Sequence, residues 1–343
     1  MKKIMKRLFV ILAILLTGIQ PKLAGQITSV TNSCLDCHGK LTEKQVVHKP
    51  VMYECDKCHQ SNGEVHPKED VEGFKLVKDV PALCFSCHEE KNIMKEVVHS
   101  PLKEGDCFSC HDVHSSKNEG LLSAKPPGLC YSCHNDLQTS VEAAAVQHGA
   151  LKDKKSCVSC HSPHSSPEKR MIISPEPDIC LSCHDKPIAS GERIIKDMKK
   201  MITKSKYVHG AIENNGCSVC HSPHYSENKN LLVKSFPTGN YAAAQKLNYA
   251  LCLDCHESAL YEEAETSEAT GFRNGEKNMH FLHVNKEKGR NCVNCHDVHA
   301  SNNLFLIADQ VKFGEWEMPI KFVKLPKGGS CAPGCHSEKS YVR

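Results

Sequence analysis

The chain has 343 residues, of which 22 are Cys, 22 are His and only 6% are aromatic, and its formal charge is +3. A cytosolic enzyme rarely has so many thiols, a disulfide scaffold is usually short and lacks a matching excess of histidine, and the near-neutral charge gives no basic footprint for nucleic acid. Large apolar side chains are too few for a conventional core, so we expect something else to fill the interior.

The N-terminal 25 residues have the pattern of a secretory signal peptide. An apolar stretch from Leu8 to Leu16 is followed by the small residues Ala24 and Gly25 and preceded by four basic residues, Lys2, Lys3, Lys6 and Arg7. A basic start, a short apolar run and a small-residue cleavage site are typical of export. The alternative is an uncleaved anchor, for which the run is short. We expect residues 1–25 to be removed, and we expect the remaining 26–343 to have no transmembrane span.

All cysteines fall into eleven pairs, and a histidine follows each pair directly. The eleventh pair is stretched by one residue and reads Cys331-Ala332-Pro333-Gly334-Cys335-His336. The ten regular C-x-x-C-H motifs are Cys34/Cys37/His38, Cys55/Cys58/His59, Cys84/Cys87/His88, Cys107/Cys110/His111, Cys130/Cys133/His134, Cys157/Cys160/His161, Cys180/Cys183/His184, Cys217/Cys220/His221, Cys252/Cys255/His256 and Cys292/Cys295/His296.

This motif is the attachment signature of c-type haem. Two thiols three positions apart can both bond the vinyl edge of the haem, and the histidine then binds iron as the proximal ligand. Zinc ribbons and thioredoxin-like sites also use C-x-x-C pairs, but neither requires a histidine after every second cysteine. We therefore predict eleven haems c, ten on regular motifs and one on the stretched motif.

Eleven further histidines match the number of predicted irons, which suggests that every iron has two histidine ligands. Four of them follow a motif as H-x-x-H, His66 follows His59 at a longer distance, and five lie seven to nine residues before a motif; His280 falls outside these sets, with the haem of the stretched motif as one target. The candidate second ligands are His48, His66, His99, His114, His148, His164, His209, His224, His280, His283 and His299.

The H-x-x-H spacing predicts that neighbouring haems are locked together. Two histidines three positions apart on a helical turn have Cβ atoms only about 5–6 Å apart. The second imidazole therefore cannot reach the opposite face of the haem that the first one binds. We expect His114, for example, to bind a haem other than that of Cys107 and Cys110.

The repeated motifs resemble the doubled-CXXCH multihaem cytochromes c, and the chain is similar in scale to the periplasmic decahaem subunits of porin–cytochrome electron conduits. About five two-haem repeats and a final haem motif cover Cys34 to His336. The resemblance implies a mostly irregular fold, with short α-helices wrapped around a chain of covalently bound haems and little or no β structure. It also implies electron transfer between redox proteins, with an outer-membrane porin as a further partner.

The motifs favour an electron carrier over an enzyme. Candidate ligands and irons are equal in number, so no open iron site is evident, and the sequence has neither C-x-x-C-K nor G-x-S-x-G. A haem oxidoreductase acting on nitrogen or sulfur oxyanions and a subunit of an extracellular cytochrome filament stay as alternatives. We expect export to the periplasm, with outer-membrane-associated or extracellular locations open.

Between the motifs, the sequence predicts a few local elements. Apolar residues on one face predict a helix from Arg193 to His209, and we also expect helices over Tyr241 to Ala250 and Glu257 to Glu268. A small hairpin is predicted within Val311 to Leu325. Each haem has only about 29 residues, and pieces below roughly 40 residues rarely fold without metals or cross-links. The chain without haem is therefore expected to be largely unfolded.

Overall fold

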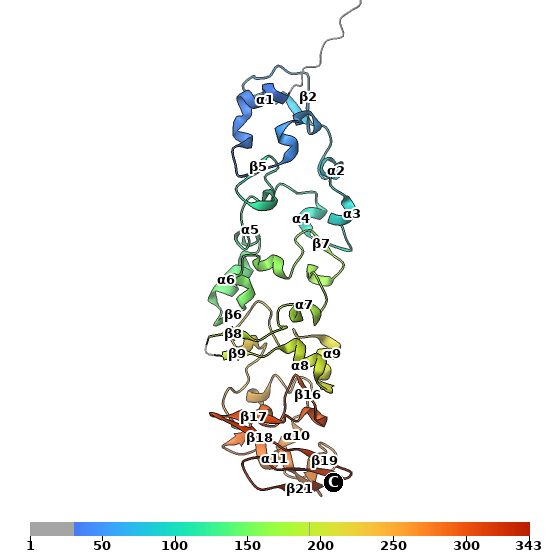
Figure 1. Cartoon of the computed structure of the whole chain (residues 1–343), viewed down its shortest axis with the longest axis vertical. Helices are drawn as coiled ribbons and strands as arrows, with labels where there is room; N and C mark the ends of the chain where they lie inside the picture. The colour runs from blue at the N-terminus through green and yellow to red at the C-terminus, as the bar shows by residue number, and fades with distance from the viewer. Residues whose placement is uncertain (1–30, 192) are drawn as a thin grey trace, which may run out of the picture.

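The computed structural model describes residues 31–191 and 193–343, so the predicted signal peptide at 1–25 lies outside the described residues. The chain forms a long rod (Figure 1), and its segments follow one another from end to end in sequence order, with the C-terminus at the end opposite Thr31. Within the described ranges, no helix is long and apolar enough to cross a membrane.

The helices of the described residues are short, with four to nine residues each in the α-helices. Three of them, α2, α5 and α7, begin directly after Pro81, Pro127 and Pro177, because the fixed φ of proline suits a helix start. The α-helices are α1 Thr31–His38, α2 Ala82–Phe85, α3 Glu90–Ile93, α4 Ser100–Lys103, α5 Gly128–Tyr131, α6 Asn135–Ala143, α7 Asp178–Leu181, α8 Met198–Lys204, α9 Gly210–Asn215, α10 Ala259–Glu262 and α11 Met279–Val284.

Turns of 3-10 helix connect these helices and carry several motifs. The described ones are η1 Gly39–Thr42, η2 Lys49–Met52, η3 Cys55–Lys57, η4 Glu119–Leu121, η5 Gly149–Lys152, η6 Ser156–Ser159, η7 Lys169–Met171, η8 Lys229–Leu231, η9 Lys246–Tyr249, η10 Cys292–Asn294 and η11 Leu304–Leu306.

Four antiparallel pairs of two-residue strands join segments that are distant in sequence. In each pair, the strand before an upstream histidine meets the strand after an H-x-x-H motif, for example Val47 opposite Ser115. The pairs are β1 Val46–Val47 with β5 Ser115–Ser116, β4 Val97–Val98 with β7 Ser165–Ser166, β6 Val146–Gln147 with β11 Tyr225–Ser226, and β10 Tyr207–Val208 with β16 Ala300–Ser301.

The other strands form hairpins and small sheets, all antiparallel, and one further pair, β12 Tyr241–Ala242 with β15 Gly289–Arg290, also joins segments that are distant in sequence. Before residue 236 the hairpins are β2 His59–Ser61 with β3 Phe74–Leu76, and β8 Ile188–Ser190 with β9 Arg193–Ile195. The C-terminal part also has β13 Arg273–Asn274 with β14 Lys277–Asn278, β17 Gln310–Phe313 with β18 Trp316–Pro319, and the sheet β19 Val323–Leu325, β20 Gly328–Cys331 and β21 Lys339–Val342. The β structure is thus more extensive than the little or no β that we expected.

Buried apolar clusters lie in the C-terminal part of the described chain. One contains Ala308, Val311, Met318 and Ile320. The other contains Tyr249, Tyr261 and Val284, with half-buried neighbours from Phe236 onward. Before Phe236, the buried apolar residues are scattered singly, as Leu102, Val141, Leu181 and Ile212.

The structure corrects three of the local predictions and confirms one. Residues 193–195 form β9 instead of a helix, and α8 begins only at Met198, where the Asp197 side chain accepts a hydrogen bond from the Lys200 N–H and caps the helix. The predicted helices over 241–250 and 257–268 are wrong: the first segment holds β12 and η9, and the second holds only α10. The predicted hairpin within 311–325 is confirmed by β17 and β18.

Candidate haem sites along the rod

Each regular motif forms a single tight turn that gathers its three functional side chains. In the eight regular motifs from Cys84 to His296, the histidine N–H donates to the carbonyl oxygen of the first cysteine, for example at 3.0 Å from His111 to Cys107 and from His161 to Cys157. An i to i−4 bond of this kind closes one helical turn. Both thiols and the imidazole therefore come from the same turn.

The structure brings every motif histidine opposite a second histidine, in eleven pairs with ring centroids 5.9–6.5 Å apart. We number the sites 1 to 11 by the chain order of their motifs. In that order the pairs are His38 with His66, His59 with His114, His88 with His48, His111 with His164, His134 with His99, His161 with His224, His184 with His148, His221 with His299, His256 with His209, His296 with His280, and His336 with His283.

The distances within these pairs fit a metal ion held between two imidazoles. An imidazole nitrogen binds a metal at about 2 Å, and the ring centre lies roughly 1 Å behind that nitrogen, so two rings sharing one ion have centres about 6 Å apart. In nine pairs the two ring planes are close to parallel, with interplanar angles of 12–27°. Sites 9 and 11 are tilted, at 45° and 38°.

The pairing follows two rules that connect different motifs. The second histidine of H-x-x-H lies opposite the histidine of an earlier even-numbered site, so that His114 faces His59 and not His111. The histidine upstream of an even-numbered motif lies opposite the next odd-numbered motif, as His48 does with His88. No two paired histidines of the described chain come from the same motif.

Two histidines differ from their expected positions. His66, grouped with His59 on the sequence, lies opposite His38. His280 faces His296 of site 10, and it is His283 that faces His336 of the stretched motif. Both lie on α11, where Asn278 caps the helix by accepting from the N–H of His280, so the packing of this helix decides which imidazole reaches which site.

The two-residue strands hold the upstream histidines in place. Directly after β1, the His48 N–H donates to the carbonyl oxygen of His114 at 3.0 Å, and its Nδ1 lies 3.1 Å from the carbonyl oxygen of Val113. The carbonyl fixes a proton on Nδ1 and leaves Nε2 free to bind a metal. His99 repeats both contacts with His164 and Pro163.

A second carbonyl orients the motif histidines of sites 4, 6, 8 and 10. Nδ1 of His111 lies 2.8 Å from the carbonyl oxygen of Gly120, nine residues later. The same spacing and a distance of 2.9 Å recur in the pairs His161 with Arg170, His221 with Asn230, and His296 with Phe305. These acceptors were not predicted from the sequence, although the serine five residues after each of these four histidines was a detectable signal of the loop.

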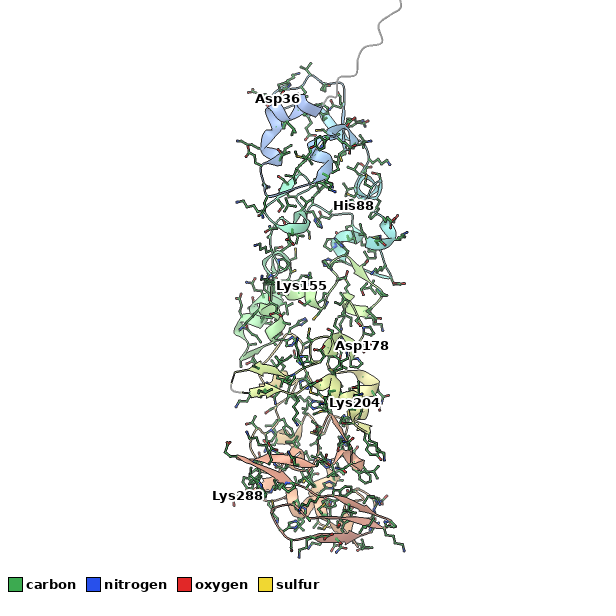
Figure 2. The ribbon with its side chains drawn as sticks, in the orientation of Figure 1. Asp36, His88, Lys155, Asp178, Lys204 and Lys288 are labelled. Atoms are coloured by element: carbon green, nitrogen blue, oxygen red, sulfur yellow. The ribbon has the colours of Figure 1, made fainter. Side chains whose placement is uncertain are left out.

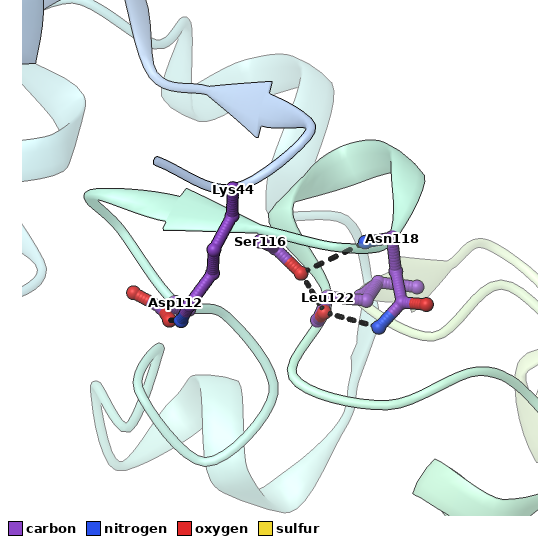
Figure 3. Close-up of polar contacts among 5 residues, drawn as sticks. All are labelled: Lys44, Asp112, Ser116, Asn118 and Leu122. Carbon is purple, nitrogen blue, oxygen red and sulfur yellow. Dashed lines mark hydrogen bonds and ion pairs between the residues drawn. The ribbon is translucent and has the colours of Figure 1, made fainter. Parts of the chain in front are cut away.

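A serine closes the loop that carries each of these carbonyls by bonding the carbonyl two residues further on, and Figure 3 shows the first copy. The Ser116 hydroxyl donates to the carbonyl oxygen of Leu122 and accepts from the Asn118 N–H at 3.0 Å, while the Asn118 amide donates to the same carbonyl at 2.9 Å. Gly120 has φ of 66°, and non-glycine residues take the same left-handed conformation in the later copies. Side chains seldom adopt this conformation, so the loop is held rigidly.

Cysteine contacts order the sites along the rod. At five junctions the first cysteines of consecutive motifs lie close enough for one to shift the pKa of the other: Cys34 with Cys55, Cys84 with Cys107, Cys130 with Cys157, Cys180 with Cys217, and Cys252 with Cys292. At the other five junctions the second cysteines are close enough to interact electrostatically: Cys58 with Cys87, Cys110 with Cys133, Cys160 with Cys183, Cys220 with Cys255, and Cys295 with Cys335. The two junctions alternate, and together they join all eleven sites in one file.

One continuous cavity runs past ten of the eleven sites. Its volume is about 4650 Å³, and both histidines of sites 1 to 10 line it. This amounts to about 465 Å³ for each site, within the range of roughly 300–1,000 Å³ that holds one small-molecule ligand. The residues present therefore fit a row of haems.

Burial favours the neutral imidazoles that bind metals. Burial, together with the neighbouring His296 and His283, lowers the pKa of His280 to about 4. Burial is also the main cause that lowers the pKa of His164 and of His224. A neutral histidine is the form that ligates a metal.

Site 11 differs from the others in its turn and its surroundings. Because this motif has an extra residue between its cysteines, the His336 N–H donates to the carbonyl oxygen of Pro333 at 3.3 Å and not to that of the first cysteine. Cys331 is the last residue of β20, and Cys335 is exposed, with its Sγ 3.1 Å from Met318 Sδ. Neither His336 nor His283 lines the large cavity.

The protein is a multihaem c-type cytochrome. It matches the doubled CXXCH motif family over residues 48–93, 99–139, 148–189 and 209–260, which together make up more than half of the chain, and it belongs to this family. Its motifs bind haem c covalently, and it takes part in electron transfer. Family membership was predicted from the sequence and is confirmed. No curated protein matches the chain.

The family segments agree with the pairing of the histidines. They begin at His48, His99, His148 and His209, and each contains an even-numbered motif and the odd-numbered motif after it. In the structure, the first residue of each segment faces the histidine of the second motif in that segment. In each family segment, a histidine pair thus joins the first residue of the segment to its second motif.

Proposed function

We propose that the chain carries electrons along eleven haems c in single file, each with two histidine ligands from different motifs. The observation that carries this proposal is the set of eleven histidine pairs, which uses all 22 histidines once. When bound, haem supplies a one-electron Fe(III)/Fe(II) couple, and two histidine ligands favour a low potential relative to His/Met ligation.

The side chains of this protein would have three tasks. The cysteines of each motif anchor a haem edge, and their alternating junctions bring consecutive edges together. The paired histidines would ligate the haem iron, and the carbonyls at Nδ1 fix the tautomer and orientation of those imidazoles. The loops and strands around the cavity exclude water along the file.

The full use of histidines supports an electron carrier over an enzyme. A haem enzyme needs an iron position that substrate can enter, and here each motif histidine has a partner in its own chain. A filament that needs ligands from a neighbouring subunit is disfavoured for the same reason. We propose that the protein has no catalytic haem.

We further propose that the protein is exported and works outside the cytoplasm. The N-terminal pattern of basic, apolar and small residues supports export of residues 26–343, and haem c proteins with signal peptides are expected in the periplasm. The rod shape of the described chain (Figure 1), together with motifs spread along its length, suits transfer between redox proteins docked at its two ends. An outer-membrane porin is a further partner, which co-purification would test.

Intact mass and low-temperature electron paramagnetic resonance test the proposal on the purified holoprotein. We expect a mass that corresponds to eleven attached haems on a chain lacking its first 25 residues, and ferric signals that are all low-spin. A substantial high-spin signal, or turnover with nitrite or hydroxylamine, would favour an enzyme. Fewer than eleven haems would contradict the single file.

A further inference from the structure

Two charged side chains lie at junctions of the file without any ion-pair partner in the described chain. Arg290 lies between sites 10 and 11, and Glu176 lies between sites 7 and 8. The ion pairs that the described residues do form all have side chains that are partly or fully exposed. A charge that is shielded from water and unpaired acts over a longer distance than an exposed one.

Arg290 is held between two aromatic rings beside the last two sites. Its guanidinium carbon lies 4.6 Å from the ring centre of Tyr241 and 4.5 Å from that of Phe313. One guanidinium nitrogen is buried without a hydrogen-bond partner, and the other lies 3.6 Å from Cys335 Sγ. Lys155 takes the corresponding place two residues before Cys157, but it is exposed (Figure 2).

Glu176 brings the opposite charge to an earlier junction. Its carboxylate lies within 4.8 Å of the sulfurs of Cys180 and Cys217 and accepts a hydrogen bond from the Ser218 N–H at 2.8 Å. Gly216 leaves room for it, since a Cβ there would lie 2.5 Å from the carboxylate oxygen.

The internal repeats supply a comparison for Glu176. It stands four residues before the first cysteine of site 7, where sites 3 and 5 have Val80 and Pro126. The carboxylate is therefore not needed to build this turn, since apolar residues serve in two of the three copies.

We infer that Arg290 stabilises the reduced state at sites 10 and 11 and that Glu176 destabilises it at sites 7 and 8, so that electrons settle at the C-terminal end of the rod. Reduction of one iron from Fe(III) to Fe(II) adds one negative charge, which a nearby cation favours and a nearby carboxylate opposes. This inference rests on the proposed file of haems and adds a direction to it.

A potentiometric titration of the full-length holoprotein with dithionite as the one-electron reductant, followed by haem absorbance, tests the inference. At an effective dielectric of about 20, a unit charge roughly 10 Å away changes a one-electron equilibrium by about tenfold, or about 59 mV. In Arg290→Met, which keeps much of the packing but loses the charge, we expect about two elevenths of the absorbance change to move to lower potential by this amount.

Two further variants separate charge from structure. Arg290→Lys keeps the cation and is expected to titrate like the wild type, whereas Glu176→Gln should move a similar share of the absorbance change about tenfold in the opposite direction. A titration of Arg290→Met that superimposes on the wild type would overturn the inference, as would an equal shift in Arg290→Lys. Haem content by mass and the low-spin spectrum are measured on the same samples, so a failure of the haem file would be recognised separately.

Discussion

Residues 34–235 and residues 236–343 carry the same kind of site but are held together differently. In the first region, the described strands that join distant segments have only two residues each, and the buried apolar side chains are single and scattered. The second region has two buried clusters and a three-stranded sheet. The comparison teaches that the C-x-x-C-H turns of this family need little apolar core where haem can fill the interior. A conventional apolar core is added at the C-terminal end of the row of sites.

Removal of haem from the whole chain should separate the two regions most strongly. Without cofactor, residues 34–235 lose the filling of their cavity, and short pieces of that kind do not fold alone. We expect their amides to exchange as in an unfolded chain, while amides of β17, β18 and β20 stay protected at least about tenfold. Hydrogen exchange with mass spectrometry on a chain made without haem attachment measures this. Equal protection in both regions would break the comparison.

Truncation of a core residue should sharpen the comparison further. Ile320 is 3% exposed within the first cluster, and Ile320→Ala is expected to cost about 2–5 kcal/mol of unfolding free energy in the C-terminal region, with and without haem. Leu102→Ala is the matched variant in the first region, where Leu102 lines the cavity. Its effect should be measurable only in the haem-loaded chain, because the region is unfolded otherwise. Denaturant titrations of the haem-loaded and haem-free chains measure these effects. An equal effect of Leu102→Ala in both forms would contradict this prediction.

His114→Ala tests how units of the first region are joined. Because His114 faces His59, the variant should leave one haem of eleven, that of site 2, without its sixth ligand and high-spin. Electron paramagnetic resonance detects the signal, and it should vanish when Cys55 and Cys58 are also replaced. A signal that survives this replacement would place the lost ligand at another site, such as that of Cys107 and Cys110.

The ion pair beside the β1–β5 strand pair, which joins units of the first region, should have the smallest effect on stability. Lys44 bonds Asp112 beside β1 and β5 (Figure 3), and this hydrogen bond holds the pKa of the Asp112 carboxyl below its ordinary value of 3.8. The pair is partly exposed, so Asp112→Asn should cost at most about 1 kcal/mol. A lowered carboxyl pKa stabilises the fold above pH 3.8, and this contribution is lost as the pH falls through the lowered pKa. Thermal melts of the holoprotein at pH 7 and pH 3 would show the difference between wild type and variant shrinking at the lower pH.

The sequence predicted the family and the functional residue types, because spacing alone determines them. C-x-x-C-H requires one turn, and the H-x-x-H argument correctly placed His114 away from His111. The assignment of His280 and His283 depends on how α11 packs in the C-terminal region, and no local pattern records that packing.

The missed elements share a physical cause. The strand β20 contains Gly328 and Gly329, which have no alternating apolar pattern, and a Cβ at either would collide with Tyr341 of β21. The need for glycine at these two positions thus comes from packing against a strand that follows later in the chain, and the local sequence does not record it. The segment from Arg193 has helical periodicity, but pairing of β9 with β8 and the cap at Asp197 take precedence over it.

Anomalous diffraction at the iron edge from crystals of the holoprotein tests the central claim most directly. The account predicts eleven iron peaks in one file that follows the order of the motifs, each peak between two imidazoles from different motifs and the second peak between His59 and His114. Peaks ligated by two histidines of one motif, or a file that departs from sequence order, would contradict it.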